Sequence, residues 1–379
     1  MIENSIIQNR HKMRPILICA LIISDLLISC NNDNNDGNEN PIGETQKDIE
    51  FTGYFQRESG WIAGDGAASI DLKNGNSLWT FGDSHIDDYN ASTQTVWCLF
   101  QVRNAGLTMG NSNPENQQTY TGTGSPASLF QVGTNNEYWF WPNGGYTQND
   151  TCYVFQNRIR STGEGGSFGF ESVDSLYVSK IFVPTMEVKG YAALGSKDDI
   201  SFSLGPVADG GFQYIYGDRD NGLGRDIFVA RFPENNLYAD WEYYNGSGWT
   251  TDINQAEKIH SEFTASFSFA KIEDKYLMVT TEFSVGCDQG NKIYIQTSSV
   301  PYGPFENKKM IWTLDDQLEE HDPFFYLANI HPQYSSSEKG LLITYCINGY
   351  GDCVETCIDN RLNPDYYRPK AIRVPYDNF

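Results

Sequence analysis

The residues of this chain that could carry out acid–base chemistry are carboxylates at the edges of short apolar runs. Asp65 lies in Gly64-Asp65-Gly66, Asp218 ends Tyr216-Gly217-Asp218, and Glu262 lies in Ser261-Glu262-Phe263-Thr264. An ionised carboxylate beside a protonated carboxyl group can act as base and acid in one reaction. Gathering several acids costs free energy unless a cation or a shared proton relieves the repulsion, so such a cluster indicates function. Asp65, Glu262 and Asp218 are therefore the candidate catalytic residues.

A second group of residues near the same runs could bind a ligand. Its members are polar or aromatic: Asp83, His85, Trp141, Tyr146, Arg219, Glu282, His331 and Asn348. An aromatic ring stacks on the C–H face of a sugar, while acids bind its hydroxyls. Structural explanations stand beside each of these, since an Asp can stabilise a turn and a lone His is more often a core residue bonded to a carbonyl.

The elements that would position these residues form an imperfect repeat of about 65 residues. In each unit, short β-branched or aromatic runs are separated by Gly, Asn and Asp turns. The second unit comprises 125–132, 137–142 and 151–159. Five such units predict an all-β fold, a five-bladed β-propeller in which residues 51–56 supply an outer N-terminal strand that closes the ring. A two-sheet sandwich, or a pair of them, is the alternative.

The predicted topology places most of the candidate residues on one face of the disc. The first two strands of a blade are antiparallel, so the start of the first and the end of the second lie at the same face. Unit by unit, these positions hold mainly acids and a histidine: Asp65, Asp83, Asp199, Asp218, Glu262, Glu282 and His331. Acids gathered around a channel mouth could also hold Ca²⁺ or another cation.

Composition limits the possible functions. The chain has 379 residues, of which 14% are aromatic and 20% charged, and this excludes intrinsic disorder and coiled coil. Its formal charge of −23 argues against nucleic-acid partners. Cys98 and Cys152 are expected to be buried thiols. One disulfide is expected among Cys346, Cys353 and Cys357, with Cys287 taking the remaining thiol.

The N-terminal segment has the pattern of an export signal. Basic residues precede an apolar run over 15–28, and small residues close it, so residues 1–29 are predicted to be a signal peptide. Leu27-Ile28-Ser29-Cys30 resembles a bacterial lipobox, which makes Cys30 the expected lipidation site; an ordinary cleaved signal and an uncleaved anchor are the alternatives. Residues 30–48 are acidic and Asn-rich and are expected to form a flexible tether, followed by the propeller domain over 49–379.

Three motifs carry a resemblance to a known group of proteins. They are Gly64-Asp65-Gly66-Ala67-Ala68-Ser69, Leu78-Trp79-Thr80-Phe81-Gly82-Asp83-Ser84 and His331-Pro332. With them, residues 50–379 resemble five-bladed propeller lipoproteins of Bacteroidota whose function is unknown and which are related to endo-D-arabinanase propellers. The resemblance implies a lipid-anchored protein of the outer membrane, exposed at the cell surface.

A looser resemblance links the chain to the arabinanase and xylosidase propellers of glycoside hydrolase family forty-three. It implies that Asp65 is the base, that Asp199 or Asp218 tunes a pKa, that Glu262 is the acid, and that His331 lies near a central cation. The expected function is hydrolysis of a polysaccharide, arabinan-like by preference, with no cofactor required. A non-catalytic glycan-binding propeller of a polysaccharide-uptake system is the first alternative, and a structural surface protein that holds Ca²⁺ is the second.

Overall fold

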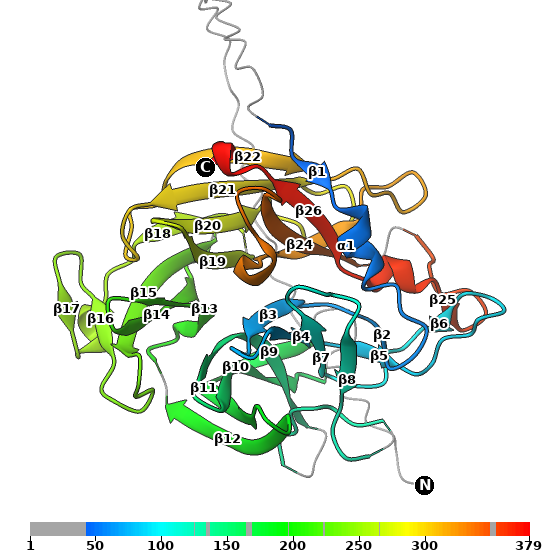
Figure 1. The fold of residues 1–379 in the computed structure, drawn as a ribbon, viewed down its shortest axis with the longest axis horizontal. Coiled ribbons are helices and arrows are strands. Elements are labelled where there is room, and N and C mark those ends of the chain that lie inside the picture. The colour runs from blue at the N-terminus through cyan, green and yellow to red at the C-terminus, as the bar shows by residue number, and fades with distance from the viewer. Residues whose placement is uncertain are drawn as a thin grey trace, which may run out of the picture. The chain divides into compact units, whose positions relative to one another are not determined.

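Five β-sheets surround a common axis in the computed structural model, so the predicted five-bladed β-propeller is confirmed (Figure 1). The structure describes residues 43–379 except 125, 134–136, 164–168, 196, 223, 265 and 349–353. The signal peptide, Cys30, most of the tether and Cys353 therefore lie outside the described residues. None of the described helices is long and apolar enough to span a membrane.

The first two blades are antiparallel sheets of four strands each, given from the axis outward. Blade 1 contains β3 (Ala68–Asp71), β4 (Asn76–Phe81), β7 (Ala105–Gly110) and β8 (Gln117–Tyr120). Blade 2 contains β9 (Tyr138–Gln148), β10 (Thr151–Ser161), β11 (Phe170–Phe182) and β12 (Glu187–Gly195).

Blade 3 is larger than its neighbours. It contains β13 (Ser201–Asp209), β14 (Phe212–Asp220), β15 (Arg225–Pro233), β16 (Glu242–Tyr244) and β17 (Trp249–Thr250), and β18 (His260–Glu262) pairs with β15 beside β16. Blade 4 contains β19 (Phe267–Ile272), β20 (Lys275–Thr281), β21 (Lys292–Ser298) and β22 (Glu306–Thr313).

Blade 5 joins the two ends of the domain. Its strands are β23 (Phe324–Ile330), β24 (Leu341–Asn348), β26 (Lys370–Val374) and, from the N-terminus, β1 (Gln46–Lys47). The ring is thus closed by an N-terminal strand, but not by the predicted one. The predicted strand over 51–56 does not form, and its first three residues belong to helix α1 (Ile49–Gly53). The Asp48 side chain caps this helix by accepting from the Phe51 amide at 2.8 Å.

Strand β1 precedes residue 49, the predicted start of the propeller domain, and pairs with β26 in blade 5. Helix α1 follows at once and buries Phe51 among the rings of Trp79 and Tyr334. Short 3-10 helices at Ile253–Gln255, Pro332–Tyr334, Pro364–Tyr367 and Tyr376–Asn378 complete the helical content of the described residues.

The second predicted unit is shifted by one strand. Residues 125–132 contain no strand among those described, and the run that was predicted to be the second strand is part of the innermost strand, β9. The apparent turn at Pro142-Asn143-Gly144-Gly145 continues β9 instead of ending it. Glycine is needed there because a Cβ on Gly144 would collide with the Gly205 carbonyl oxygen of the neighbouring blade.

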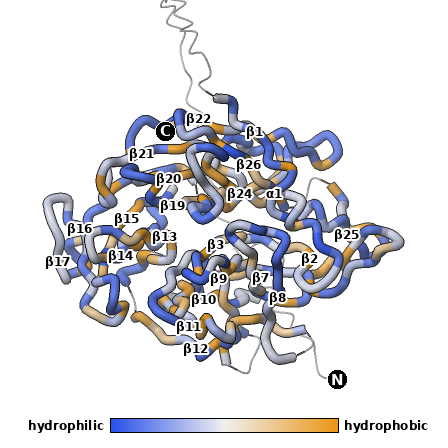
Figure 2. Tube along the Cα trace, in the orientation of Figure 1, coloured by the Kyte–Doolittle hydropathy of each residue, from blue (hydrophilic) through white to orange (hydrophobic). Residues whose placement is uncertain are grey.

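The hydrophobic core lies between the blades. Each pair of adjacent blades buries an apolar cluster; the one between blades 4 and 5 includes Leu277, Ile295, Ile343 and Tyr345. In Figure 2 the hydrophobic residues follow the strands, whereas the connections at the rim are mainly hydrophilic. Because the sheets pack face to face around a ring, the ends of the inner strands are left free to form a site at either face.

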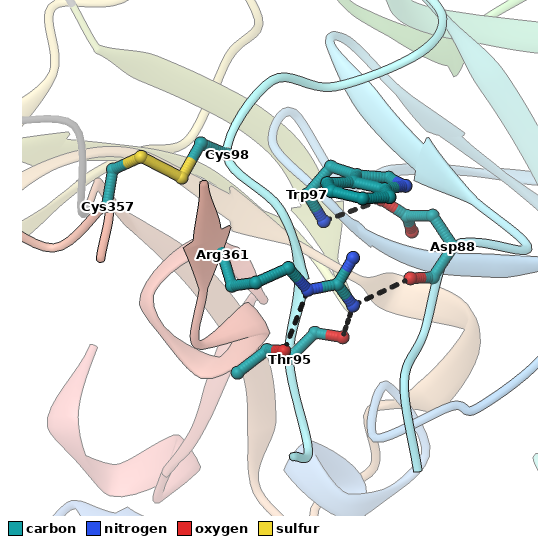
Figure 3. Close-up of a disulfide and its surroundings, with 6 residues drawn as sticks. All are labelled: Asp88, Thr95, Trp97, Cys98, Cys357 and Arg361. Carbon is teal, nitrogen blue, oxygen red and sulfur yellow. Dashed lines mark hydrogen bonds between the residues drawn. A yellow bond between two sulfur atoms is a disulfide. The ribbon is translucent and has the colours of Figure 1, made fainter. Parts of the chain in front are cut away.

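Two loops outside the blades are joined by a disulfide. Strands β6 (Val96–Trp97) and β25 (Arg361–Leu362) pair, and Cys98 is bonded to Cys357 beside them (Figure 3). The prediction that Cys98 is a free thiol was therefore wrong. The expected disulfide among Cys346, Cys353 and Cys357 was also wrong, because Cys357 bonds to Cys98 and Cys346 is a free thiol. Arg361 reinforces the junction through the carbonyl oxygens of Asp88 and Thr95 (Figure 3). Cys287 is also disulfide-bonded, while Cys152 and Cys346 are buried free thiols.

Candidate functional site

The structure brings Asp65 and Asp83 together at one face of blade 1. Asp65 precedes β3 and Asp83 follows β4, and the Gly82 amide donates to the Asp65 carbonyl oxygen at 2.9 Å. The Asp65 carboxylate lies over Gly82, where any Cβ would meet its Oδ1. Glycine at position 82 is thus required for the close approach of this carboxylate to the segment that carries Asp83.

Tyrosine hydroxyls hold the Asp65 carboxylate. Tyr326, near the start of β23, donates to Asp65 Oδ2 at 2.8 Å, and the Tyr367 hydroxyl is a second partner. Asn348, at the end of β24, donates to the Tyr326 oxygen at 3.2 Å. Burial raises the pKa of Asp65 above its ordinary value, and the two tyrosine hydrogen bonds oppose that increase by stabilising the ionised form.

Asp83 has a different environment from that of Asp65. Its carboxylate accepts from Arg103 Nη1 at 3.2 Å and from the indole nitrogen of Trp141 at 3.2 Å. Burial and the nearby charge of Asp65 raise the pKa of Asp83 to about 7, although Arg103 and Trp141 favour the ionised form. Its side chain remains 12% exposed, so the carboxyl group is still reached from solvent.

This pair of acids can hold a proton at neutral pH. Two buried carboxyl groups near each other do not both ionise readily, because each charge raises the pKa of the other. Burial raises the pKa of both groups, but Asp65 receives hydroxyl donors that favour its charged form, and its charge helps to raise the pKa of Asp83 to about 7. The site therefore contains one group suited to accept a proton and one suited to donate it.

Aromatic side chains border the pair. Trp141 meets Phe170 edge to face with ring centroids 4.7 Å apart, and Arg103 lies over the Trp139 ring at 4.2 Å. Arg103 is 41% exposed and faces solvent beside Asp83. Arg103, Tyr326 and Tyr367 were not predicted from the sequence. Only Tyr326 gave a signal, since it lies in a run predicted to be the first strand of its blade.

Asp218 lies on blade 3 and is paired with a cation. Its Oδ2 is 2.5 Å from Arg225 Nε, and burial raises its pKa. Arg219, predicted to bind substrate, forms an ion pair with Asp198 at 3.3 Å. Asp218 lies near the end of β14. This strand end of blade 3 corresponds to the end of β4 in blade 1, which Asp83 follows.

Glu262 occupies a position that does not suit the proton-donor role predicted for it. It lies in β18, whose partner is β15, and both of its oxygens accept from Lys308 Nζ at 2.8 Å. Burial opposes ionisation here, but hydrogen bonds from His260 and Lys308 outweigh it and lower the pKa to about 2. Glu262 is therefore ionised near neutral pH, and its partners are not those of Asp65.

Glu282 lies just beyond β20, at a strand end that corresponds to that of Asp83 in blade 1. It accepts from the Asn291 amide at 2.9 Å and lies 3.8 Å from Lys292. These contacts fix a turn of blade 4. They leave the interpretation of Glu282 as a substrate ligand without direct support.

His331 is a core residue at the end of β23. Its Nδ1 is 2.7 Å from the Ser69 hydroxyl, its Nε2 is 2.7 Å from the Thr344 hydroxyl, and its ring lies 4.3 Å from that of Trp79. Burial lowers its pKa to about 3. With both ring nitrogens occupied, His331 does not fit the role of a cation ligand. Within the described part of the chain, no group of three or more His, Cys, Asp or Glu is placed to hold a metal ion.

Two further residues predicted to bind substrate are buried in structural roles. The imidazole of His85 is inaccessible to solvent and hydrogen-bonds through Nδ1 to Asp88 at 2.9 Å. Tyr146 stacks on Tyr153 with centroids 5.1 Å apart and packs in the core between blades 2 and 3. Neither side chain presents a surface to a ligand.

Comparison with protein families decides where the chain belongs. A model described as a domain of unknown function, DUF5005, matches residues 48–377. The chain belongs to this family. Among curated proteins, none matches the sequence.

The chain is also similar to solved structures. A candidate hydrolase from Bacteroides ovatus is 21% identical, with 89% of this chain and 92% of that chain covered and a TM-score of 0.68. An exo-β-1,3-galactanase from Phanerochaete chrysosporium, solved with β-1,3-galactotriose, is 12% identical, with 82% and 60% covered and a TM-score of 0.46. A GH43 enzyme from Xanthomonas citri, solved with xylotriose, is 12% identical, with 86% and 94% covered and a TM-score of 0.43. At these identities the likeness to the first concerns the fold alone, and the other two carry no further argument.

Proposed function

We propose that this DUF5005 protein is a glycoside hydrolase whose catalytic pair is Asp65 and Asp83. The observation that carries the proposal is the meeting of Asp65 and Asp83 across Gly82, where burial and the charge of Asp65 raise the pKa of Asp83 to about 7. Hydrolysis of a glycosidic bond needs a carboxyl group that is still protonated at the working pH and a second that is ionised. The pair supplies both within one face of blade 1.

In the proposed reaction each carboxyl group handles one proton. Asp83 donates its proton to the glycosidic oxygen as the bond from the anomeric carbon to that oxygen breaks. Asp65 accepts a proton from the water whose oxygen forms the new bond to the anomeric carbon. The tyrosine hydroxyls of Tyr326 and Tyr367 orient Asp65 and stabilise it while it is ionised. Trp141 offers an aromatic face next to the reacting bond.

Asp65 keeps the base role expected from the sequence, but the acid role passes from Glu262 to Asp83. Glu262, with a pKa of about 2, carries no proton to donate near neutrality. Asp218 also has a raised pKa, caused by burial, but its neighbour is Arg225, so it is assigned to substrate binding and local charge balance.

The expected substrate is a polysaccharide or oligosaccharide, with arabinan as the first to test. The proposed location is the cell surface, with Cys30 lipidated and the outer membrane as the anchor. The Cys98–Cys357 disulfide supports an oxidising compartment, because such bonds rarely persist in the cytosol.

A screen of glycans tests the hydrolase directly. Wild-type protein, Asp65→Asn and Asp83→Asn would be incubated with arabinans, xylans, galactans and pectic oligosaccharides, and new reducing ends measured. Cleavage of at least one glycan by the wild type, reduced at least ~100-fold in both variants, is expected. Full activity in either variant would remove that residue from the mechanism.

The rival function is glycan binding without hydrolysis. It is favoured by the fact that Arg103 and Trp141 already occupy the oxygens of Asp83, as in a fixed hydrogen-bond network. Retention of a glycan by wild-type protein with no release of reducing ends from any member of the panel would support binding and contradict the hydrolase.

A further inference from the structure

A pocket of about 260 Å³ lies between blades 2 and 3. Its lining includes Asn157 and Arg158 from β10, Ser172 from β11, Lys197, Asp199, and Ser201 at the start of β13. The Ser201 hydroxyl donates to Asn157 Oδ1 at 3.1 Å, so a hydrogen bond between the two blades fixes one wall. The pocket is therefore built from strand residues of both blades as well as from loop residues.

Strand register places this pocket beside the candidate site. Asn157 is paired with Trp141 across β9 and β10, and Trp141 donates to Asp83. Ser201 is paired with Asp218 across β13 and β14. If a glycan bound over Trp141, one of its sugar units would therefore extend toward Asn157 and Ser201.

The charge in the pocket is opposite to that of the protein. The chain carries a formal charge of −23, yet two cations, Arg158 and Lys197, line this pocket. Neither forms an ion pair with any residue that the structure describes. By contrast, Arg103, Arg225 and Lys308 all pair with carboxylates. Asp199 also lines the pocket but is exposed to solvent.

The two cations are held by neutral partners that leave their charge uncompensated. Arg158 donates to the Tyr177 hydroxyl at 2.8 Å and lies over the Tyr138 ring at 4.1 Å, and its Nε is buried without a hydrogen-bond partner. Lys197 Nζ lies over the Trp241 ring at 4.8 Å. Burial lowers the pKa of Lys197, which means that an anion at this point would relieve the cost of its charge.

We infer that this pocket binds the carboxylate of an acidic sugar, a uronic acid, within the glycan that occupies the Asp65–Asp83 site. The guanidinium of Arg158 matches the geometry of a carboxylate, and Lys197 adds a second charge. Asn157 and Ser201 are placed to bind ring hydroxyls. The inference rests on the proposed function for the position of the substrate, and it adds that the substrate carries negative charge.

A matched pair of ligands tests the pocket. Binding of an oligogalacturonide and of the same oligosaccharide with its carboxyl groups methyl-esterified would be measured by calorimetry on the folded protein. Wild type is expected to bind the acid at least ~10-fold more tightly than the ester, and added salt is expected to reduce the difference. Arg158→Gln and Lys197→Gln are expected to abolish the preference, Arg158→Lys to reduce it, and the exposed control Lys189→Gln to leave it intact.

The outcomes separate this inference from the hydrolase proposal. Equal binding of acid and ester by wild type, binding of neither, or an acid preference that survives both Gln substitutions in folded protein would overturn the inference. Cleavage of neutral glycans with no acid preference would overturn it while the hydrolase stands. An acid preference lost in both Gln variants, with no cleavage of any glycan, would support the pocket and contradict the hydrolase.

Discussion

One backbone hydrogen bond holds Asp65 next to Asp83: the amide of Gly82, the residue before Asp83, donates to the Asp65 carbonyl oxygen at 2.9 Å. This arrangement sets two buried carboxyl groups close enough for the charge of Asp65 to contribute to the raised pKa of Asp83. The consequence is a proton held at neutral pH at a position reached from solvent.

The raised pKa of Asp83 predicts a particular dependence of stability on pH. Its folded pKa of about 7 lies above the ordinary aspartate value of 3.8, so the folded state binds the proton more tightly than the unfolded chain. This contribution to stability is present at low pH and is lost as the pH rises toward and through 7, with an upper limit of about 4 kcal/mol. Urea unfolding should show Asp83→Asn losing less stability than wild type between pH 5 and 8. The exposed control Asp274→Asn should follow wild type.

Removal of the Tyr326 hydroxyl should keep Asp65 protonated up to a higher pH. Tyr326→Phe deletes a hydrogen bond that lowers the pKa of Asp65, so that pKa should rise further. The acid limb of the pH–activity profile should move to higher pH and activity at pH 6 should fall about 10-fold. Tyr54→Phe, which loses only a bond to Glu50, is the matched control. An unchanged acid limb in Tyr326→Phe would argue against Asp65 as the base.

Glu262 should be dispensable for activity but not for stability. Glu262→Gln is expected to change the hydrolysis rate less than ~3-fold, because the site residues are Asp65 and Asp83. The folded pKa of Glu262, about 2, lies below the ordinary glutamate value of 4.5, so its stabilising contact with Lys308 is present above pH 4.5 and lost as the pH falls through 2. Lys308→Gln should therefore lower the melting temperature at pH 7, and this difference should shrink on acidification. Loss of activity in Glu262→Gln would restore the acid role to this residue.

The disulfide should contribute to the stability of the folded domain. Cys98 and Cys357 are 259 residues apart in sequence, so their bond closes a long loop in the unfolded chain. Cys98→Ser is expected to reduce the free energy of unfolding by about 2–4 kcal/mol. Cys152→Ser changes a buried free thiol and provides a comparison within blade 2. Equal stability of wild type with and without reductant would contradict the prediction.

Local pattern was enough to predict the repeat and the meeting of Asp65 with Asp83. The alternation of apolar runs and turns shows which strands are antiparallel neighbours within one blade. The repeat and the meeting of Asp65 with Asp83 both follow from that pairing. Trp141 was predicted at the site although its strand was misassigned. Gly144 and Gly145 have the composition of a turn, yet both lie within β9, and Gly144 allows the close approach of β9 to β13.

Contacts between segments that are far apart in the chain could not be predicted from the sequence. Glu262 belongs to β18, which pairs back onto β15, and nothing in its neighbourhood distinguishes it from the start of β19. Tyr367 reaches Asp65 from a 3-10 helix of the last unit, and Arg103 reaches Asp83 from the connection that follows Val102. These partners determine the pKa values, so the acid could not be assigned before the structure was known.

Titration of the aspartate carboxyl carbons by NMR tests the central claim most directly. Protein labelled with ¹³C at aspartate would be followed from pH 3 to 9 for wild type and Asp83→Asn. A carboxyl resonance that titrates near pH 7 is expected in wild type and should be absent from Asp83→Asn. A second resonance, from Asp65, should be shifted by the substitution. If every aspartate in the wild type titrates below pH 5, Asp83 holds no proton at neutral pH and the proposed acid–base pair is contradicted.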